Sequence, residues 1–494
     1  MKKWLTLMAL GCAFSTAAFA LSAQNINGLI KKNNAGWVAR DNHISKLDPT
    51  EIRRLLGSKD LPSDNALFED RSEVPESIDW RNERGVNWLG PVMNQGNCGS
   101  CVAFAAIATL ESSYRIQSGL PWLMPTFSPQ QLFNCGGGVC DNGWWPAGAA
   151  NMLKNKGVVD AACVPYESGS TGEDIQCKKN FCQNQSERTY KISNYTSPSF
   201  AGGTASKVKE ALKRGPLLTT LRVYEDFLYY SSGIYKSVSR KSVGGHAVSL
   251  VGFNDAQRYW IVRNSWGSDW GENGFIRVSY DDYSGIGNST WAYQVRPEDN
   301  TISIDSLTGR EYVSGEKKFK VMMAKAADSE LVIQGESQSS LVLSCETKEE
   351  SSCEVSLDTT NLKDGRYEIY AKTPSVKSQV RELFVVNHEP RSTISFSGAQ
   401  GIDLKKAQSG RIEFDISVKA DPVMPQKITF YVEDSNGQII NSRVTDEVVE
   451  KMRLGFRTNT LSNGQYLIYY SVETPYNGTV VKAMSEKVVL IVKN

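Results

Sequence analysis

The stretch Gln95-Gly96-Asn97-Cys98-Gly99-Ser100-Cys101 runs directly into an apolar, helix-forming segment at residues 102–110. Cys101 therefore stands where a helix is expected to begin, and the positive end of the helix dipole favours the thiolate form of its side chain. A thiolate attacks carbonyl carbons, and the side-chain amide of Gln95 offers a donor to the oxyanion that results. The stretch predicts a nucleophilic cysteine.

A Cys-x-x-Cys pair also occurs in redox motifs, in metal sites and in disulfide frameworks. A zinc site would need further histidines or cysteines at ligand spacing, and the sequence around Cys98 supplies none. A thioredoxin-like motif would need a short βαβ context, whereas a Gly-rich polar stretch precedes this pair. We therefore expect no metal site and no cofactor.

Two later motifs give the cysteine its partners. They are Gly245-His246-Ala247 and Asn264-Ser265-Trp266-Gly267. The other two histidines of the chain, His43 and His388, lie outside this region, so His246 has no rival as a base. A nucleophile, a base and an orienting amide thus occur in the order Cys, His, Asn, which indicates nucleophilic catalysis.

Taken together, these blocks resemble the papain (cathepsin-type) family of cysteine proteases, over residues 75 to about 297. Other matching text is Asn134-Cys135, Cys140-Asp-Asn-Gly143, Gly215-Pro216, the set Phe227, Tyr230, Gly233 and Tyr235, and residues 264–274. The resemblance implies an α+β fold with a papain-like, two-lobed catalytic domain, one lobe helical and the other resembling a β-barrel. It also implies hydrolysis of peptide bonds in polypeptide substrates.

The resemblance assigns roles to the motif residues. Cys101 would attack the scissile carbonyl, while His246 would hold the thiolate as an ion pair and then protonate the leaving amine. Asn264 would orient the imidazole, and Gln95 with the backbone N–H of Cys101 would form the oxyanion hole. Trp266 would cover the contact between Asn264 and His246 and exclude water.

Some positions depart from the family pattern. Val102 stands where the family usually has tryptophan, which removes packing but no catalytic group. Gly143 would bind the substrate backbone, and the neighbouring Trp144 and Trp145 either form the cleft wall or simply pack. Ser289 would lie in the second specificity pocket, where some relatives carry an acid, so we expect an apolar preference there.

The N-terminus has the features of a secretory signal over residues 1–20. Lys2 and Lys3 precede a mainly apolar run, and Ala18-Phe19-Ala20 is an A-x-A cleavage pattern. The run is too short for a membrane anchor, and no other segment is long enough to span a bilayer. We expect a secreted protein, extracellular or periplasmic.

Nine cysteines remain after signal cleavage, so a free thiol is expected, and Cys101 would be that thiol. Eight paired cysteines favour an oxidising compartment. By resemblance, Cys98 would pair with Cys140. The other proposed pairs are Cys135–Cys177, with Cys163 as the alternative partner of Cys135, then Cys163–Cys182 and Cys345–Cys353.

Residues 21–74 resemble the short propeptide of cathepsin B-like enzymes. Two short amphipathic pieces are expected, at residues 29–37 and 48–57, with Asp48 capping the second. A propeptide would lie along the cleft and keep the enzyme latent, with processing near Glu73-Val74-Pro75. The paired histidines that let cathepsin B trim C-termini have no counterpart in residues 163–182, so we expect endopeptidase activity.

Almost 200 residues follow the protease part, with strand-like alternation instead of helical periodicity. Residues 361–370 recur as 460–469, an offset of 99 residues, which is one β-sandwich length. We expect two immunoglobulin-like sandwiches, at 300–390 and 391–494. They serve either as a spacer or to bind a surface, glycan or protein ligand.

Length and charge agree with this organisation. The chain has 494 residues and a formal net charge of +1, so it accommodates several domains and nothing indicates nucleic-acid binding. Two other function classes are weighed against a protease zymogen. One is a non-catalytic adhesion or binding protein with a papain-like shell, and the other is a Cys-His transferase or cell-wall amidase.

Overall fold

The computed structural model describes residues 22–47, 49–60, 76–198, 205–295, 301–305, 307, 310–335, 340–345, 351–399, 402–445, 448–458 and 461–494. The expected signal segment, Asp48, the expected processing site at residues 73–75 and residues 296–300 lie outside them. Within the described residues, no helix is both long and apolar enough to cross a bilayer.

The helices lie in the first half of the chain. In the described residues they are α1 (Ala23–Lys32), α2 (Pro49–Leu55), α3 (Cys101–Ser118), α4 (Pro129–Gly136), α5 (Pro146–Asn155), α6 (Ser168–Thr171) and α7 (Ala205–Leu212), with 3₁₀ turns η1 (Glu225–Tyr229) and η2 (Thr359–Asn361). Helix α3 is buried on nearly all sides through residue 113, which is the pattern of a central core helix. It packs against α4 and α5 on one side and against β8 (Ser242–Asn254) on the other.

A large sheet forms the second lobe. Its strands run in the order β1 (Trp37–Ala39), β7 (Tyr230–Tyr235), β10 (Phe275–Ser279), β9 (Tyr259–Arg263), β8, β6 (Leu217–Tyr224), β11 (Thr290–Gln294) and β5 (Asn194–Thr196), with β2 (Ser77–Asp79) paired to β8. A small pair, β3 (Val158–Val159) and β4 (Thr189–Tyr190), lies apart from it. Because β1 pairs with β7, the N-terminal segment is built into the edge of this sheet.

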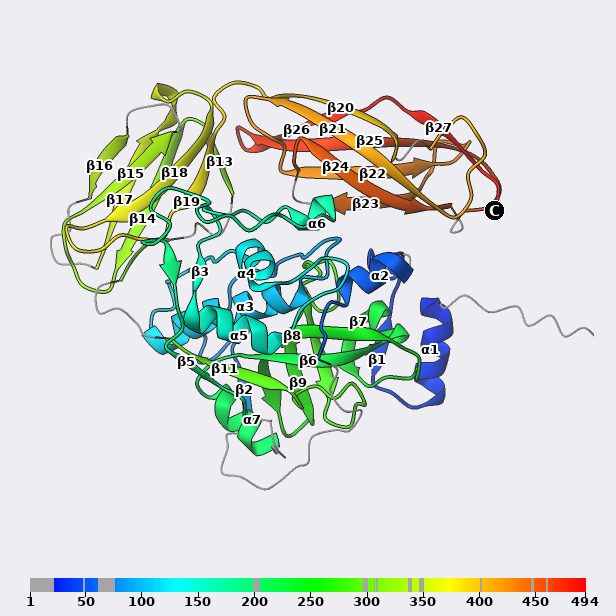
Figure 1. The fold of residues 1–494 in the computed structure, drawn as a ribbon, viewed down its shortest axis with the longest axis horizontal. Helices are drawn as coiled ribbons and strands as arrows, with labels where there is room; N and C mark the ends of the chain where they lie inside the picture. Colours follow the sequence, from blue (N-terminus) through cyan, green and yellow to red (C-terminus); the bar gives the residue numbers. More distant parts are fainter. Residues whose placement is uncertain are drawn as a thin grey trace, which may run out of the picture.

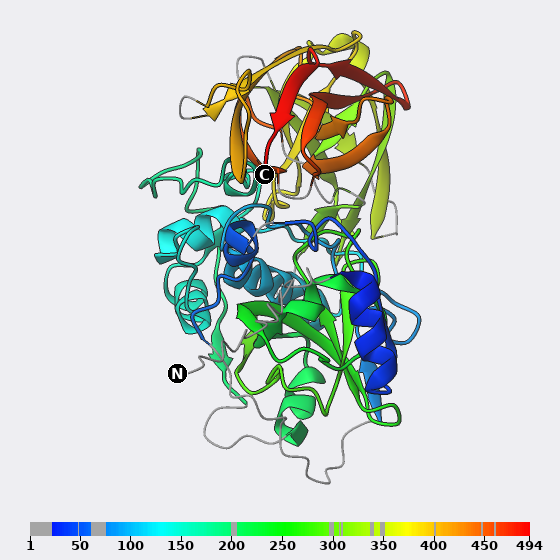
Figure 2. The ribbon, with the colours of Figure 1, turned by 90° about the vertical axis from the view of Figure 1, so that its right-hand side faces the viewer.

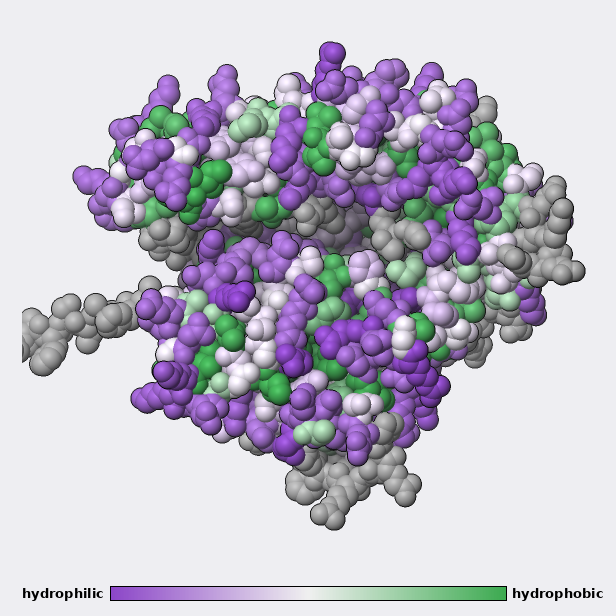
Figure 3. All heavy atoms as spheres, turned by 180° about the vertical axis from the view of Figure 1, so that it is seen from behind, coloured by the Kyte–Doolittle hydropathy of each residue, from purple (hydrophilic) through white to green (hydrophobic). Residues whose placement is uncertain are grey.

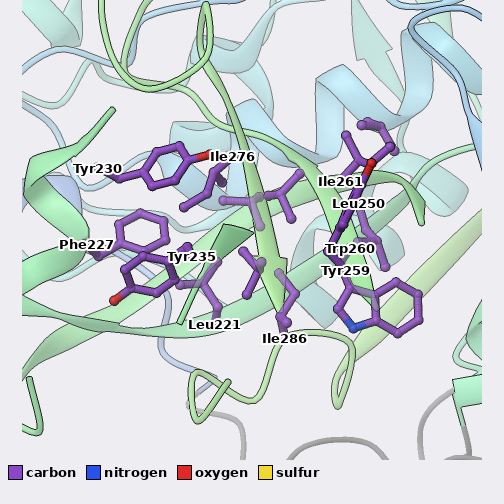
Figure 4. Packing of buried hydrophobic residues seen from close by; sticks show 14 of the residues in the cluster. Leu221, Phe227, Tyr230, Tyr235, Leu250, Tyr259, Trp260, Ile261, Ile276 and Ile286 are labelled. Atoms are coloured by element: carbon purple, nitrogen blue, oxygen red, sulfur yellow. The ribbon is translucent and has the colours of Figure 1, made fainter. Parts of the chain in front are cut away.

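The core of this lobe is aromatic and aliphatic (Figure 4). Tyr230 and Tyr235 come from β7, and Leu221 comes from β6. Trp37 of the N-terminal segment packs on them, with its ring centroid 5.0 Å from that of Tyr235. Residues preceding the protease part therefore share its hydrophobic core.

Two pairs of facing sheets follow. The first pair is β12 (Ile302–Ile304), β14 (Glu316–Met323) and β17 (Ser352–Asp358), against β13 (Glu311–Val313), β19 (Arg381–Val385), β18 (Gly365–Lys372), β15 (Ser329–Gly335) and β16 (Leu341–Cys345). The second pair is β20 (Arg391–Gly398), β21 (Arg411–Asp421) and β24 (Lys451–Arg457), against β23 (Ile439–Thr445), β22 (Lys427–Glu433), β25 (Gly464–Tyr476), β26 (Thr479–Met484) and β27 (Val488–Val492). Each pair encloses its own hydrophobic core, so each is a β-sandwich.

The internal repeat has a structural counterpart. Gly365 begins β18 and Gly464 begins β25, and the tyrosine two residues later is placed alike in both strands. The hydroxyl of Tyr367 donates to the carbonyl of Lys363 across 2.8 Å, and that of Tyr466 donates to Ser462 across 2.8 Å. This contact, four residues back, is the tyrosine corner of immunoglobulin-like sandwiches.

The sandwiches lie side by side along one face of the protease part (Figures 1 and 2). The guanidinium of Arg381 in β19 donates to the hydroxyl of Thr126 across 2.7 Å and also to the carbonyl of Met124. Arg188 bridges the buried carboxylate of Asp160 and Glu368 of β18. The first sandwich is therefore held on the helical lobe by buried polar contacts.

The exterior is mainly hydrophilic on the face drawn in Figure 3, with apolar residues scattered over it. On the second sandwich, Ile439, Ile440 and Val444 of β23 are at least 40% exposed. The disulfides join the cysteine pairs Cys98–Cys140, Cys135–Cys177, Cys163–Cys182 and Cys345–Cys353. These are the pairs given first in the sequence analysis.

Candidate active site

Cys101 is the first residue of α3, at the junction of the two lobes. Among the described cysteines it alone is outside a disulfide. The backbone N–H of Ala247, the residue after His246, is positioned to hydrogen-bond its sulfur. The Cys98–Cys140 disulfide and the bond from Gly99 N to Cys140 O, 2.9 Å long, fix the backbone that leads into the helix.

His246 lies in β8, and Asn264 follows β9 directly. Their Nε2 and Oδ1 atoms are 2.8 Å apart. The same Oδ1 accepts the backbone N–H of Ser265 across 2.8 Å, which identifies it as the amide oxygen, so Nε2 of His246 is the donor. In the neutral imidazole, Nδ1 is then the basic nitrogen.

Trp266 covers the histidine. Its ring centroid is 4.7 Å from that of His246, and it is fully buried against Phe227 and Trp270. His43 of the N-terminal segment contacts the carbonyl of Trp266 with Nε2 at 2.9 Å. The indole therefore separates the histidine from solvent on this side.

Gln95 is oriented by three neighbours. Its Oε1 accepts the hydroxyl of Ser265 across 2.7 Å, so the NH₂ end faces the other way. Nε2 donates to the carbonyl of Leu55 across 3.2 Å and to that of Cys98 across 3.0 Å. The amide thus donates to a backbone carbonyl that belongs to the N-terminal segment.

Residues 55–59 follow the cleft past Cys101. Gly57 accepts the N–H of Trp144 across 2.8 Å, and Lys59 donates to the Trp144 carbonyl across 3.0 Å. The backbone N–H of Ser58 donates to the carbonyl of Gly245 across 3.2 Å. The two β-bridges that result, Gly57 with Gly245 and Ser58 with Trp144, are both parallel. A Cβ on Gly57 would overlap the backbone of Gly99, so only glycine fits at position 57.

The three predicted substrate-binding residues lie in different surroundings. Gly143 has φ +68°, and a Cβ there would overlap the carbonyl of Gly57. The backbone partner of the N-terminal segment is Trp144, one residue further on, whose side chain is buried, while that of Trp145 is exposed. Ser289 is buried, and its carbonyl accepts the hydroxyl of Thr219.

The covered site favours uncharged side chains. Burial raises the pKa of Cys101 to about 11, although hydrogen bonds from Ala247 and Gly57 act in the opposite direction. Burial lowers the pKa of His246 to about 4, against the hydrogen bonds to Asn264 and Leu55. Beneath the N-terminal segment, a thiol and a neutral imidazole are therefore the stable forms.

The sequence motifs contain Trp144, Gly245 and Asp141, but sequence reasoning missed their contacts with the N-terminal segment. The main-chain groups of Trp144 and Gly245 bind the N-terminal segment, and Asp141 pairs with Arg54 of that segment across 2.8 Å. The Gly-rich character of residues 136–143 was the signal for close backbone approach. No group of three or more potential metal ligands occurs among the described residues.

Comparison with known proteins agrees with this geometry. The profile of the family described as "Papain family cysteine protease" matches residues 74–294. Cathepsin B-like CP3 of Giardia intestinalis is 34% identical over 277 residues, which is 53% of this chain and 91% of that protein. The chain belongs to the papain family of cysteine proteases.

Other papain-family proteins are similar to the same region. Cathepsin B-like CP2 of Giardia intestinalis is 34% identical and is covered to 91% of its length. Among solved structures, procathepsin B S9 from Trypanosoma congolense matches 56% of this chain and 99% of its own, at 24% identity and a TM-score of 0.47. Like its family, this protein is a cysteine peptidase with a papain-like fold.

Proposed function

We propose that the protein is a secreted cysteine endopeptidase made as a zymogen, in which residues 21–74 are an inhibitory propeptide. The observation that carries the proposal is the path of residues 55–59, which lie across Cys101 and hydrogen-bond to Gln95, Trp144 and Gly245. A substrate cannot occupy the same hydrogen-bonding groups while this segment remains in place.

In the proposed mechanism, the thiolate of Cys101 attacks the scissile carbonyl. His246 holds that thiolate as an ion pair, and its imidazolium then gives the proton to the leaving amine. The amide of Asn264 keeps Nε2 engaged, so that Nδ1 exchanges the proton. Water then hydrolyses the acyl-enzyme, with Nδ1 of His246 as the base.

Gln95 is the proposed oxyanion donor, together with the backbone N–H of Cys101. The bond from Nε2 of Gln95 to the Leu55 carbonyl supports this role, because it places a backbone carbonyl oxygen at that amide. Propeptide departure frees the donor for the scissile carbonyl. The same departure hydrates Cys101 and His246, which lowers the pKa of the thiol and raises that of the imidazole.

Substrate recognition follows from the same surfaces. Gly143 leaves room for a backbone beside Trp144, Trp266 shields the histidine, and Ser289 presents no acid to the second specificity pocket. We propose a preference for an apolar residue second from the scissile bond.

The propeptide is also held in the cleft by backbone bridges. Its bridges with Trp144 and Gly245 are parallel. Trp37 also anchors it in the aromatic core of the second lobe. Its glycine at position 57 fits between Gly99 and Gly143, where any side chain would collide with backbone.

The proposed boundaries are a signal peptide at 1–20, the propeptide, a protease domain at 75–297, and sandwich modules at 300–390 and 391–494. The disulfides support export to an oxidising compartment. Exposed Ile439 and Val444 on β23 support a binding role for the second module toward a surface, glycan or protein ligand.

The test follows cleavage of a fluorogenic peptide with an apolar residue second from the scissile bond. The purified proprotein is incubated at mildly acidic pH with a reducing agent, beside Cys101→Ala. We expect activity that rises as residues 21–74 are lost, and no activity in the variant. Processing without activity in a folded protein would contradict the proposal and favour a binding protein.

A further inference from the structure

A cavity of about 550 Å³ lies where the helical lobe meets the two sandwiches. Glu111 and Arg115 of α3 line it from the helical lobe. Arg381 of β19 lines it from the first sandwich, and Thr445 of β23 lines it from the second. The cavity is therefore a feature of the whole chain, because no single domain encloses it.

Buried positive charge exceeds buried negative charge beside this cavity. Arg115, Arg263 and Arg381 are 5%, 2% and 5% exposed. Each of these guanidiniums interacts with the charge of Glu111, which is also 5% exposed. A guanidinium stays protonated when it is buried, so its charge has to be balanced by an anion.

The buried carboxylates do not balance these charges. Oε1 of Glu111 accepts the backbone N–H of Phe127 across 3.0 Å, and within the described residues this carboxylate is neither hydrogen-bonded nor directly ion-paired to an arginine. Arg381 also faces Asp160, but Arg188 already binds both oxygens of that carboxylate, at 2.7 and 2.8 Å. Even without Arg381, two guanidiniums share the one charge of Glu111, and an uncompensated buried charge is costly.

The other carboxylates in the cavity wall have cations of their own. Glu382 pairs with Arg366 across 2.7 Å and with Arg310 across 3.6 Å. Glu311 pairs with Lys317 across 2.7 Å. Neither carboxylate is therefore free to neutralise the guanidiniums of α3 and β9.

Unused donors show where a counter-charge would bind. Nη2 of Arg115 donates to the carbonyls of Asn87 and Pro121. Its Nε and Nη1 are buried and have no acceptor in the part of the chain that the structure describes. The same holds for Nη1 of Arg263, although its Nη2 donates to the carbonyl of Pro91. Because Arg115 lines the cavity, a negatively charged acceptor there would satisfy both its charge and its donors.

We infer that this cavity binds a small monovalent anion, a halide or a carboxylate, through the unused N–H groups of Arg115. Arg263 and Arg381 add positive charge, and Arg381 brings its charge from the first sandwich. Burial raises the pKa of Glu111 to about 7, so at mildly acidic pH this neighbour no longer repels an anion. The bound anion stabilises the contact between the helical lobe and the first sandwich. The inference does not depend on the proposed protease function.

The experiment uses the full-length proprotein carrying Cys101→Ala, so that no processing occurs. Its Tm is measured at mildly acidic pH while sodium chloride or sodium acetate is raised from about 1 to about 100 mM. The test variant is Arg115→Lys. The matched control is Arg277→Lys, since Arg277 pairs with Glu272 across 2.6 Å on β10, outside the cavity wall. Lysine keeps the charge, so general screening by salt acts alike on all three proteins.

We expect the Tm of the parent protein and of Arg277→Lys to rise by about 2–4 °C in at least one salt, and that of Arg115→Lys to rise by less than about 1 °C. A rise in chloride alone assigns the site to halides, and a rise in acetate alone assigns it to carboxylates. Equal rises in the parent protein and Arg115→Lys in both salts would overturn the inference.

A second measurement decides the matter if Arg115→Lys does not fold. Crystals of the Cys101→Ala proprotein are soaked in sodium bromide or in sodium bromoacetate, and bromine is located by its anomalous signal. We expect a bromine peak beside Arg115 in at least one of the two soaks. The absence of a peak there in both soaks would overturn the inference.

Discussion

The side-chain amide of Gln95 donates a hydrogen bond to the backbone carbonyl of Leu55 across 3.2 Å. Gln95 belongs to the protease part and Leu55 to the N-terminal segment that precedes it. The group proposed to stabilise the oxyanion is thus occupied by the chain's own backbone. In this arrangement, latency and catalysis depend on the same donor.

Replacement of Gln95 by alanine tests the oxyanion role. We expect kcat of the activated enzyme to fall by about 10²- to 10³-fold, because the developing charge loses a preorganised donor. Gln257→Ala is the control, since that side chain is exposed in a turn far along the chain. Steady-state kinetics on one peptide checks both variants, and a Gln95→Ala enzyme of normal kcat would refute the role.

Replacement of Trp37 by alanine tests propeptide anchoring. Trp37 is 3% exposed and its Nε1 donates to the carbonyl of Lys236 across 3.0 Å, so its loss should weaken propeptide docking by about 3–5 kcal/mol. We expect the zymogen to be converted to the processed enzyme faster at neutral pH, and we expect the Tm of the zymogen to be lower. The mature enzyme should have an unchanged kcat/KM, because it no longer contains residue 37.

Val38→Ala is the matched control for this variant. Val38 lies on the same strand, but its side chain is 42% exposed. It should therefore convert at the wild-type rate. Equal conversion rates for the two variants, measured by the appearance of the processed band, would count against anchoring by Trp37.

The pH dependence of thiol labelling tests whether the N-terminal segment suppresses the thiolate of Cys101 in the zymogen. With the pKa of Cys101 raised to about 11 by burial, its thiolate fraction in the zymogen is small below that pH and rises as pH approaches it. We expect iodoacetamide to label the zymogen slowly from pH 5 to 9. After processing, labelling should be fast at pH 6. Equal rates before and after processing would show that the propeptide does not suppress the thiolate.

Arg381→Ala tests the docking of the first sandwich. Arg381 is 5% exposed and binds Thr126 and the carbonyl of Met124, so its loss leaves buried acceptors without donors. We expect destabilisation by about 2–3 kcal/mol in denaturant unfolding, and easier proteolytic separation of the sandwiches. Arg391→Ala, at an exposed position of β20, should behave as wild type. Unchanged stability of Arg381→Ala would contradict docking through this residue.

The two tyrosine corners differ in burial, so we expect them to contribute unequally to the free energy of unfolding. Tyr367 is buried and Tyr466 is half-buried, although each hydroxyl donates to a carbonyl four residues earlier. Tyr367→Phe should lower the free energy of unfolding by about 1 kcal/mol, and Tyr466→Phe by less. The reverse order in equilibrium unfolding would contradict the conclusion that burial sets the contribution of each corner.

The sequence alone predicted the family and the two-lobed fold because the motifs around Cys101, His246 and Asn264 are local. Each is a short run whose residue types suit one chemistry. The strands of both sandwiches were also predictable, since alternation and the repeat at an offset of 99 residues are properties of the sequence. The family comparison confirms the first of these predictions.

Other features depend on contacts between distant segments. Residues 29–37 were expected as one amphipathic piece, whereas α1 ends at Lys32 and Trp37 begins a strand paired with β7. The pairing partner lies almost 200 residues away, and the local pattern does not encode it. The anchoring of Arg381 at Thr126 was unpredictable for the same reason.

The most direct test of the central claim labels the protein with a thiol-reactive peptidyl inhibitor and maps the adduct by mass spectrometry. We predict no adduct on the full zymogen and one adduct on Cys101 after loss of residues 21–74, with activity abolished in proportion to labelling. An adduct on Cys101 of equal extent before processing would contradict the latent state. A processed, folded protein that takes no label would contradict the assignment of Cys101 as its nucleophile.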